Sequence, residues 1–349
     1  SSSMQSQEAQ NFAMDLMAIN PVQALKGYWN TASDKLQNLF SPAAAGWHSG
    51  FTVSPPEKPV ARGNQYGDTF DDDTISVREP ENFWEEIAEE HFLWKKKWNS
   101  VLKWDFSKPE VKWFEGAKLN ITENCLDRHL EKRGNQTAIK WVANNPKEAI
   151  RNISYKELHA EVCKFANVLK NNGGKKGDRI CLYMPMVPEL AIAVLACARI
   201  GAIHSVVFAG FSAKSLSDRI NDADCNILIT ADGGFRGAKI TPLKDISDEA
   251  MQTTPSIEKC IVLERTKNTI SMENGRDVWW HDEMLKVTSN CPIEIMDAEA
   301  PLFILYTSGS TGKPKGIQHS TAGYMIYTEY SFRNVFQYNE GDIYWCTAD

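Results

Sequence analysis

The sequence predicts an α/β fold in which layers of parallel strands are flanked by helices and are preceded by a helical N-terminal extension. From Thr137 onward, strand patterns and helix patterns alternate along the chain. Some strand patterns are apolar at consecutive positions, as in Ile227-Leu228-Ile229, which is typical of parallel strands buried on both faces. A loop rich in glycine, hydroxyl and lysine residues follows a later apolar run, where such sheets bind their ligands.

Three segments are expected before this alternation begins. In residues 1–40, Asn20-Pro21 offers a helix cap and apolar residues recur at mostly helical intervals, which predicts an amphipathic helical head packed on its own protein. Residues 41–78 are rich in proline and glycine, as is typical of a linker. Residues 79–136 begin with helical patterns and are dense in aromatic side chains. We expect a helical segment there, with the aromatic residues as packing groups.

The elements of residues 137–349 follow from apolar patterns and from helix caps. Ser154 and Glu157 form a capping-box pattern, and Gly201 follows a run that starts with proline, Pro188 to Ile200. We expect strands at residues 137–142, 179–184, 204–208, 226–230, 260–263 and 302–306, and helices at 154–173, 188–200, 212–222 and 321–336.

Composition and charge exclude several classes of protein. The chain has 349 residues, 42% of them apolar, and a net charge of −7, which argues against nucleic acid or an anionic membrane as partners. The longest apolar run, Leu190 to Ala198, is shorter than the roughly 20 residues that a membrane span needs. No signal or transit peptide is recognisable, and the eight cysteines form neither a CxxC pair nor a Cys/His cluster. We therefore expect a cytoplasmic protein without disulfides or a zinc site.

The loop after Tyr306 has the composition of a phosphate-binding loop. Its glycines permit tight turns, its amides can surround an anion, and its hydroxyls and lysines can enclose a polyphosphate. It is not a Walker loop, because Pro314 stands where the second glycine of that pattern belongs. A Gly/Ser-rich surface turn is the alternative. The candidate residues are Thr307, Ser308, Gly309, Ser310, Thr311, Gly312, Lys313, Lys315 and Gly316.

A second candidate site follows the strand expected at 226–230. Glycines lead to Arg236, Gly237, Ala238 and Lys239, which place two cations three residues apart. If Arg236 opens a helical turn, Lys239 lies on the same face and both can meet one phosphate. The alternative is a solvated loop with incidental charges.

Other residues carry weaker chemical arguments. The Phe208–Ser212 stretch is explained by a turn that ends in a helix-capping serine. His204 lies in a strand pattern and is expected to be a core or edge histidine, whereas His319 follows the loop without a visible carboxylate partner. Neither is predicted to be a catalyst. A serine-hydrolase role for Ser308 or Ser310 fails because Gly-x-Ser-x-Gly is absent there.

The loop also carries a family resemblance. Tyr306 to Gly316 resembles the signature loop of the adenylate-forming superfamily, which includes acyl-CoA synthetases, luciferases and peptide-synthetase adenylation domains. Longer stretches are similar to the acetyl-coenzyme A synthetase family, and the match runs from about Glu79 to Asp349. These stretches are Leu119–Leu130, Tyr183–Glu189, Ala196–Val206 and Tyr344–Asp349.

The resemblance implies a fold, an activity and roles for both candidate sites. Residues 137–349 would form the AMP-binding domain. Acetate would attack the α-phosphate of Mg-ATP to form acetyl-adenylate, and coenzyme A would then take the acetyl group and release AMP. The loop would bind the β- and γ-phosphates, and Arg236 to Lys239 would bind the 3′-phosphate of coenzyme A. The family usually has arginine where Lys239 stands, so a single ammonium would replace a fork of donors.

The resemblance also implies that this chain is catalytically incomplete. The acyl pocket, the adenine and ribose contacts, the Mg²⁺ ligand and the catalytic lysine would lie beyond Asp349, so no catalytic or metal-binding residue is predicted here. Synthesis of propionyl-CoA or another short acyl-CoA is one alternative. A non-catalytic nucleotide- or coenzyme-binding fragment is the other. The sequence makes no prediction of the oligomeric state.

Overall fold

The computed structural model describes residues 78–105, 107–108, 110–307 and 314–345. The expected helical head, nearly all of the linker, and residues 308–313 of the glycine-rich loop lie outside these residues. The chain divides into two compact units, residues 1–90 and 91–349. In the described part of the first unit, helix α4 (Pro80–His91) confirms the expected helical pattern and has Trp84 and Ala88 buried.

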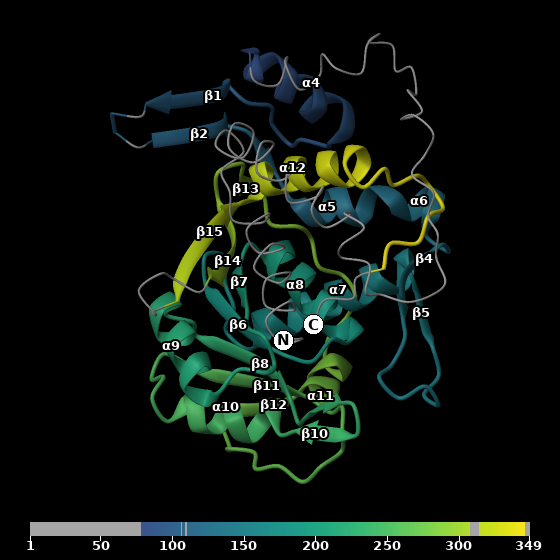
Figure 1. The fold of residues 1–349 in the computed structure, drawn as a ribbon, viewed down its shortest axis with the longest axis vertical. Helices are drawn as coiled ribbons and strands as arrows, with labels where there is room; N and C mark the ends of the chain where they lie inside the picture. Colours follow the sequence, from purple (N-terminus) through teal and green to yellow (C-terminus); the bar gives the residue numbers. More distant parts are fainter. Residues whose placement is uncertain (1–77, 106, 109, 308–313, 346–349) are drawn as a thin grey trace, which may run out of the picture. The chain divides into compact units, whose positions relative to one another are not determined.

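The second unit is built on a seven-stranded sheet (Figure 1). Six strands are parallel, and the edge strand β15 is antiparallel to β14. The order across the sheet is β12 (Asp277–Trp279), β11 (Lys259–Leu263), β8 (Ile227–Ala231), β6 (Arg179–Tyr183), β7 (Ile203–Val206), β14 (Pro301–Thr307) and β15 (Lys315–Ser320).

Helices cover both faces of this sheet and form two separate cores. One face packs on α7 (Tyr155–Asn171), α8 (Pro188–Ile200) and α11 (Trp280–Leu285). The other face packs on α9 (Ala213–Ala223) and α10 (Leu243–Met251). Side chains alternate between the two cores along each strand, so Leu182 of β6 faces the first and Tyr183 the second. The predicted parallel α/β class is confirmed.

The expected strands and helices from residue 179 onward are all present, each within a few residues of its predicted bounds. The capping box of α7 forms between Ser154 and Glu157, and Ser212 caps α9. Helix α8 ends at Gly201, whose φ of 73° is left-handed and whose Cβ position would lie 2.6 Å from the sulfur of Met296. The helix expected at 321–336 is α12 (Thr321–Asn334).

The strand expected at 137–142 forms but does not join the parallel sheet. It is β4 (Thr137–Trp141), which pairs antiparallel with β5 (Arg151–Ser154) in a separate two-stranded sheet. Its residues are mostly intermediate or exposed, unlike those of the buried parallel strands. The pattern predicted a strand correctly, but its polar positions place it outside the sheet.

The helical prediction for residues 79–136 is wrong between Phe92 and Phe114. Strands β1 (Ser100–Asp105) and β2 (Glu110–Glu115) form an antiparallel hairpin, and residues 92–98 are not helical. The rings of Trp94, Trp98 and Phe114 pack together with centroids 5.0–5.6 Å apart. These three rings therefore pack together as expected, whereas the side chain of Trp104 is 58% exposed. Contacts between the rings, and not helical periodicity, explain the spacing of the three residues.

Short elements complete the second unit. They are β3 (Lys118–Leu119), α5 (Ile121–Cys125), the 3₁₀ turn η2 (Asp127–His129), α6 (Leu130–Arg133), β9 (Gly234–Arg236), β10 (Lys239–Thr241) and β13 (Met296–Asp297). The seven described cysteines are all free thiols. Among the helices of the described ranges, none combines the length and the apolar character that a membrane crossing requires.

Candidate functional site

A pocket of about 300 Å³ opens at the carboxyl ends of β6, β7 and β8. After β6 the chain continues into α8 on one face of the sheet, and after β8 it continues into α10 on the other. Neighbouring strands whose connections leave to opposite faces create the crevice in which open α/β sheets bind ligands. The lining includes Met184–Val187, Val206–Gly210, Gly234–Arg236, Trp141, Val142, Asn144, Leu190, Thr241, Leu243 and Arg265.

The two predicted cations, Arg236 and Lys239, lie on a β-hairpin at this pocket and not on a helical turn. Strands β9 and β10 pair antiparallel, and Arg236 lies directly opposite Lys239. Gly237, in the turn, has a φ of 58°, and the carbonyl of this residue accepts a hydrogen bond from Asn144 at 2.8 Å. Opposed residues of a hairpin project from the same face, so the two cations still share one face, although the predicted reason was wrong.

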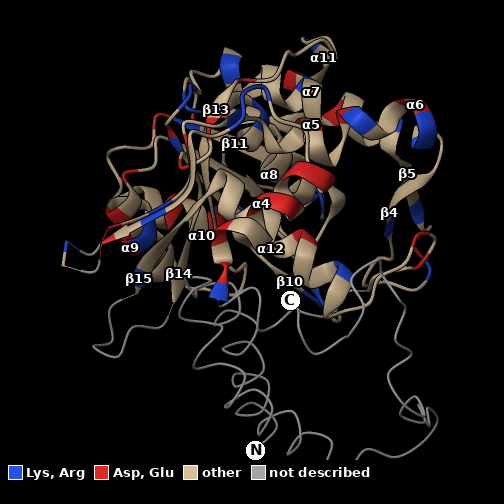
Figure 2. Ribbon diagram, turned by 90° about the horizontal axis from the view of Figure 1, so that it is seen from above, with Lys and Arg blue, Asp and Glu red and all other residues tan. Residues whose placement is uncertain are grey.

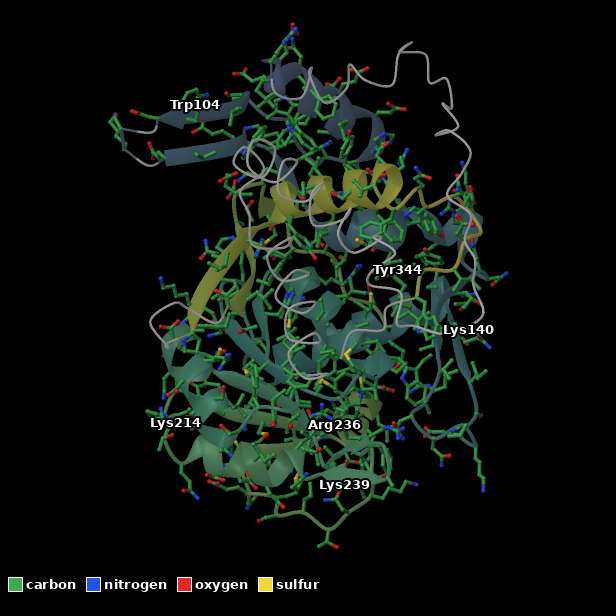
Figure 3. The ribbon with its side chains drawn as sticks, viewed as in Figure 1. Trp104, Lys140, Lys214, Arg236, Lys239 and Tyr344 are labelled. Carbon is green, nitrogen blue, oxygen red and sulfur yellow. The ribbon has the colours of Figure 1, made fainter. Side chains whose placement is uncertain are left out.

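Both cations are exposed to solvent, and Figure 3 labels them in the same region of the molecule. The guanidinium carbon of Arg236 lies 5.9 Å from the ring centre of Phe208, which lines the same pocket. The hairpin therefore presents two positive charges at the rim of a pocket whose wall is largely apolar. This arrangement suits a ligand with an anionic end and a less polar body.

Arg265 is a pocket residue that sequence reasoning missed. Its guanidinium carbon lies 5.2 Å from the ring centre of Trp141 and 4.9 Å from that of Phe235, and all three side chains line the pocket. A hydrogen bond of 2.8 Å from Nη2 to Glu148 fixes the orientation of the guanidinium. No motif surrounds Arg265, and its pocket neighbours come from distant segments, so the sequence carried no local signal for it.

Asp232 holds the backbone that carries Arg265. Its buried carboxylate accepts hydrogen bonds from the amides of Gly233, Arg265, Thr266 and Lys267 at 2.6–3.0 Å. The last three of these hydrogen bonds tie the loop after β11 to the end of β8. Asp232 directly follows β8, and its amide donates to the carbonyl of Leu263 at the end of the neighbouring parallel strand β11. The pairing of these two strands therefore sets the position of Arg265, which lies just after β11.

The described ends of the glycine-rich loop lie at this same edge of the sheet. Thr307 ends β14, Lys315 begins β15, and these two residues are register partners. Gly316 stands opposite Tyr306, and its Cβ position would lie 3.1 Å from that ring and from Ile304, so a side chain would crowd the strand pair. The other candidates, Ser308 to Lys313, lie outside the described residues.

Tyr306 anchors the start of this loop in the core. Its hydroxyl donates to Asp222 of α9 at 2.6 Å, and burial together with this bond raises the pKa of the phenol well above its ordinary value. The guanidinium carbon of Arg219 lies 5.6 Å from the Tyr306 ring and 4.6 Å from the Phe211 ring. Helix α9 thus contacts Tyr306 at the base of the glycine-rich loop, and also Phe211, which follows the pocket-lining residues Val206–Gly210.

His204 and His319 do not line the pocket. His204 is buried and stacks on Phe303, and burial lowers its pKa to about 4. The ring of His319 also stacks on Phe303, with ring centroids 4.4 Å apart, and burial lowers the pKa of this imidazole as well. Both are therefore neutral near pH 7, and His204 is the core histidine that its strand pattern predicted.

Comparison with known proteins identifies the family of this chain. Residues 126–349 match the family described as "AMP-binding enzyme", and the chain belongs to that family. Residues 74–125 match the family described as "Acetyl-coenzyme A synthetase N-terminus". The predicted resemblance to the acetyl-coenzyme A synthetase family is thereby confirmed.

Individual relatives show how much of a longer protein this chain represents. It is 55% identical over 274 residues to acetyl-coenzyme A synthetase of Magnetococcus marinus, which covers 78% of this chain and 42% of that protein. Acetyl-coenzyme A synthetase 2 of Pseudomonas aeruginosa is 53% identical with the same coverage. Acetoacetyl-CoA synthetase from Streptomyces lividans has a similar structure, with a TM-score of 0.71 and 26% identity over 77% of this chain and 41% of that one. The chain spans less than half the length of these relatives.

Proposed function

We propose that this chain forms the N-terminal part of an AMP-forming acetate–CoA ligase, which converts acetate, ATP and coenzyme A to acetyl-CoA, AMP and diphosphate. The observation that carries the proposal is the meeting of two sites at one edge of the sheet. The pocket with its Arg236–Lys239 hairpin and the ends of the glycine-rich loop both lie beyond the carboxyl ends of the parallel strands.

In the first step, a carboxylate oxygen of acetate bonds to the α-phosphorus of ATP while the bond to the departing diphosphate breaks. This reaction needs the phosphates held in line and their growing charge neutralised. In our proposal the loop residues Thr307 to Lys313, with Lys315 and Gly316, hold the β- and γ-phosphates. Mg²⁺ accompanies ATP as part of the substrate. Among the described residues no group of three His, Cys, Asp or Glu side chains is gathered to bind it.

In the second step, the coenzyme A sulfur bonds to the acetyl carbonyl carbon, AMP leaves and the thiol loses its proton. This chain's contribution is to hold the coenzyme. We assign its 3′-phosphate to Arg236 and Lys239, with the backbone of Gly237 and Ala238 closing the turn, and its less polar body to the pocket. Arg265 lines the same pocket between two aromatic rings and orients the wall against which the coenzyme lies.

The proposal includes a domain division and a location. In this proposal, residues 79–136 are the N-terminal segment of the synthetase type and residues 137–349 are the AMP-binding domain. The junction of the two family matches at residues 125 and 126 supports a division in this region. A cytoplasmic location is supported by the seven described cysteines, all of which are free thiols.

Two experiments test the proposal at different levels. A full-length form of the protein should produce AMP from ATP and coenzyme A with acetate as the best acid, and absence of AMP with acetate, propionate and butyrate alike would refute it. Calorimetric titration of residues 1–349 should show weaker binding of 3′-dephospho-coenzyme A than of coenzyme A. Equal affinities would remove the 3′-phosphate from the hairpin while leaving the enzyme class standing.

A further inference from the structure

A second hollow, of about 680 Å³, lies in the unit formed by residues 91–349 and shares no lining residue with the pocket described above. It is formed by α6 and the turn after it, the first two turns of α7, and the loop after α11. Its lining residues are Leu130–Gln136, Lys156, His159, Ala160 and Ser289. The proposed acetyl-CoA chemistry makes no use of this region.

The charged side chains in the lining of this hollow are predominantly cationic. Lys132 and Lys156 are exposed, and within the described ranges neither forms an ion pair with a carboxylate. Arg133 is 3.0 Å from the carboxylate of Glu340, which offsets its charge. Glu131 is the single acidic residue among the described residues of the lining. The side chains of the lining offer many hydrogen-bond donors, which lie beside the aliphatic side chains of Leu130 and Ala160.

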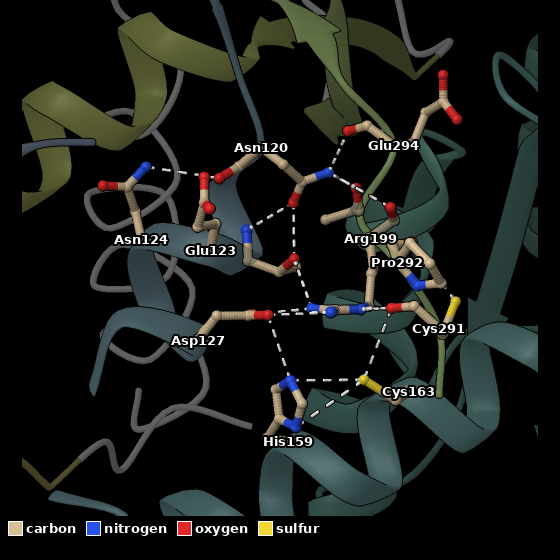
Figure 4. Close-up of polar contacts among 12 residues, drawn as sticks. Asn120, Glu123, Asn124, Asp127, His159, Cys163, Arg199, Cys291, Pro292 and Glu294 are labelled. Atoms are coloured by element: carbon tan, nitrogen blue, oxygen red, sulfur yellow. Dashed lines mark hydrogen bonds and ion pairs between the residues drawn. The ribbon is translucent and has the colours of Figure 1, made fainter. Parts of the chain in front are cut away.

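His159 adds a further positive charge to the lining, and Figure 4 shows its ring beside Asp127 and Cys163. Its Nε2 lies 3.3 Å from Asp127, and this hydrogen bond raises the pKa of the imidazole to about 9. Asp127 is simultaneously held by two bonds of 2.9 and 3.0 Å from Arg199. One carboxylate therefore serves two cations, and the Arg199–Asp127–His159 group keeps a net charge of +1. His159 is the member of this group that lines the hollow.

We propose that this hollow binds a small anion that carries a phosphate group, held by Lys132, Lys156 and His159. Charge-assisted hydrogen bonds from several cations to phosphate oxygens are stronger than neutral ones. The hydroxyl of Ser289 and the amides of Asn135 and Gln136 supply further donors. Among the described lining residues, the imidazole of His159 is the one aromatic ring. The phosphate group is the part of the ligand that these cations and donors recognise.

The proposal is tested with inorganic phosphate as the probe, on the chain of residues 1–349 at low ionic strength. NMR amide shifts of residues 131–136 and 156–160 report on the hollow itself, separately from phosphate bound elsewhere. We expect these shifts to saturate in the unaltered protein. The double variant Lys132→Gln, Lys156→Gln should weaken the apparent affinity for phosphate at least tenfold, because it removes two positive charges from the lining. Both lysines are exposed, so their replacement should leave the protein folded.

Two variants serve as matched controls. Lys164→Gln removes a lysine from the same helix α7, where it lies near Glu161 and outside the lining, and should leave the affinity within twofold. Arg236→Ala alters the proposed coenzyme site and should also leave these shifts unchanged. An absence of saturable shifts, or equal affinity in the double variant and the unaltered protein, would overturn the proposal. Loss of the shifts in Arg236→Ala would do so as well. None of these outcomes depends on acetyl-CoA synthesis.

Discussion

Cations occur in two contrasting settings within residues 91–349: a buried one at the end of α8 and an exposed one on the β9–β10 hairpin. The side chain of Arg199 is 5% exposed, and it donates to both oxygens of Asp127 and to the carbonyl of Cys291 at 2.7 Å. Arg236 and Lys239 lie in the solvent on strands of three residues each. Figure 2 marks the Lys and Arg positions along the ribbon, and among the described ones only Arg199, Arg219 and Lys244 are buried.

The difference follows from the cost of removing a charge from water. A buried guanidinium must have its donors satisfied, because each unmet donor costs stability. The network around Arg199 meets this demand and extends to Asn120, whose amide donates to the carbonyls of Ala198 at 3.1 Å and Glu294 at 2.7 Å. A cation that binds a ligand must instead stay accessible until the ligand arrives. The buried Arg199 therefore maintains the fold, whereas the exposed cations beside the pocket lie where a ligand can reach them.

Removal of the buried carboxylate should have the largest effect. Asp127→Asn leaves Arg199 buried beside a neutral side chain, and we expect the free energy of unfolding to fall by about 3–5 kcal/mol, as measured by urea denaturation. The matched control is Asp224→Asn, whose partner Arg179 and own side chain are 33% and 73% exposed. That variant should lose less than about 1 kcal/mol. Equal losses in the two variants would refute the distinction between buried and exposed pairs.

The same network predicts a loss of stability in mild alkali. The folded-state pKa of His159 is raised from 6.5 to about 9, so the protonated ring stabilises the fold fully below pH 6.5. This contribution, about 1–3 kcal/mol, is lost as the pH rises through 9. Burial opposes the charge of Asp127, but bonds from His159 and Arg199 outweigh it and lower the pKa of that carboxyl. The pKa shifts of His159 and Asp127 both arise in part from the hydrogen bond between these residues, so their contributions to the free energy of unfolding are not summed.

Denaturation at pH 6 and pH 9.5 measures this loss. His159→Gln should flatten the difference between the two pH values, whereas His281→Gln should leave it intact, because the side chain of His281 is 53% exposed. A profile unchanged by His159→Gln would assign the alkaline loss to other groups.

On the hairpin the expected effect is on binding and not on stability. Arg236→Ala should weaken coenzyme A binding about tenfold or more, the equivalent of about 1.4 kcal/mol, and should change the free energy of unfolding by less than about 0.5 kcal/mol. Lys214→Ala, a removal of an 81% exposed lysine on α9, should change neither quantity. If Arg236→Ala lowers stability as much as binding, the hairpin belongs with the structural cations.

Local sequence patterns predicted the parts of the fold that depend on local chemistry. The capping box at Ser154, the glycine that ends α8, and the consecutive apolar residues of β8 each specify a conformation by themselves. Pairing partners are not local, which is why β4 was assigned to the parallel sheet although it pairs with β5. The aromatic residues from Phe92 to Phe114 were misread as helical for a related reason, since their contacts cross a hairpin.

The site divides in the same way. Arg236 and Lys239 stand close together in the sequence, so their shared role could be inferred even though the turn type was wrong. Arg265 reaches the pocket only because the sheet places the loop after β11 beside Trp141 and Phe235. Asp127 and Arg199 are 72 positions apart, and nothing in either neighbourhood indicates that they pair.

The smallest effect is expected from Lys239→Arg, which adds hydrogen-bond donors to an exposed cation instead of removing a charge. Lysine offers a phosphate one strongly hydrated ammonium, whereas arginine offers a planar fork of donors that can bond two oxygens at once. Lys239 faces Arg236 across the hairpin without burial constraints, so the longer side chain can be accommodated. We expect coenzyme A affinity to rise about two- to fivefold, which corresponds to about 0.4–1 kcal/mol, with stability unchanged. Titration of 3′-dephospho-coenzyme A should show no such gain, since the added donors then have no phosphate to meet. A gain of equal size with both ligands would mean that position 239 contacts another part of the coenzyme.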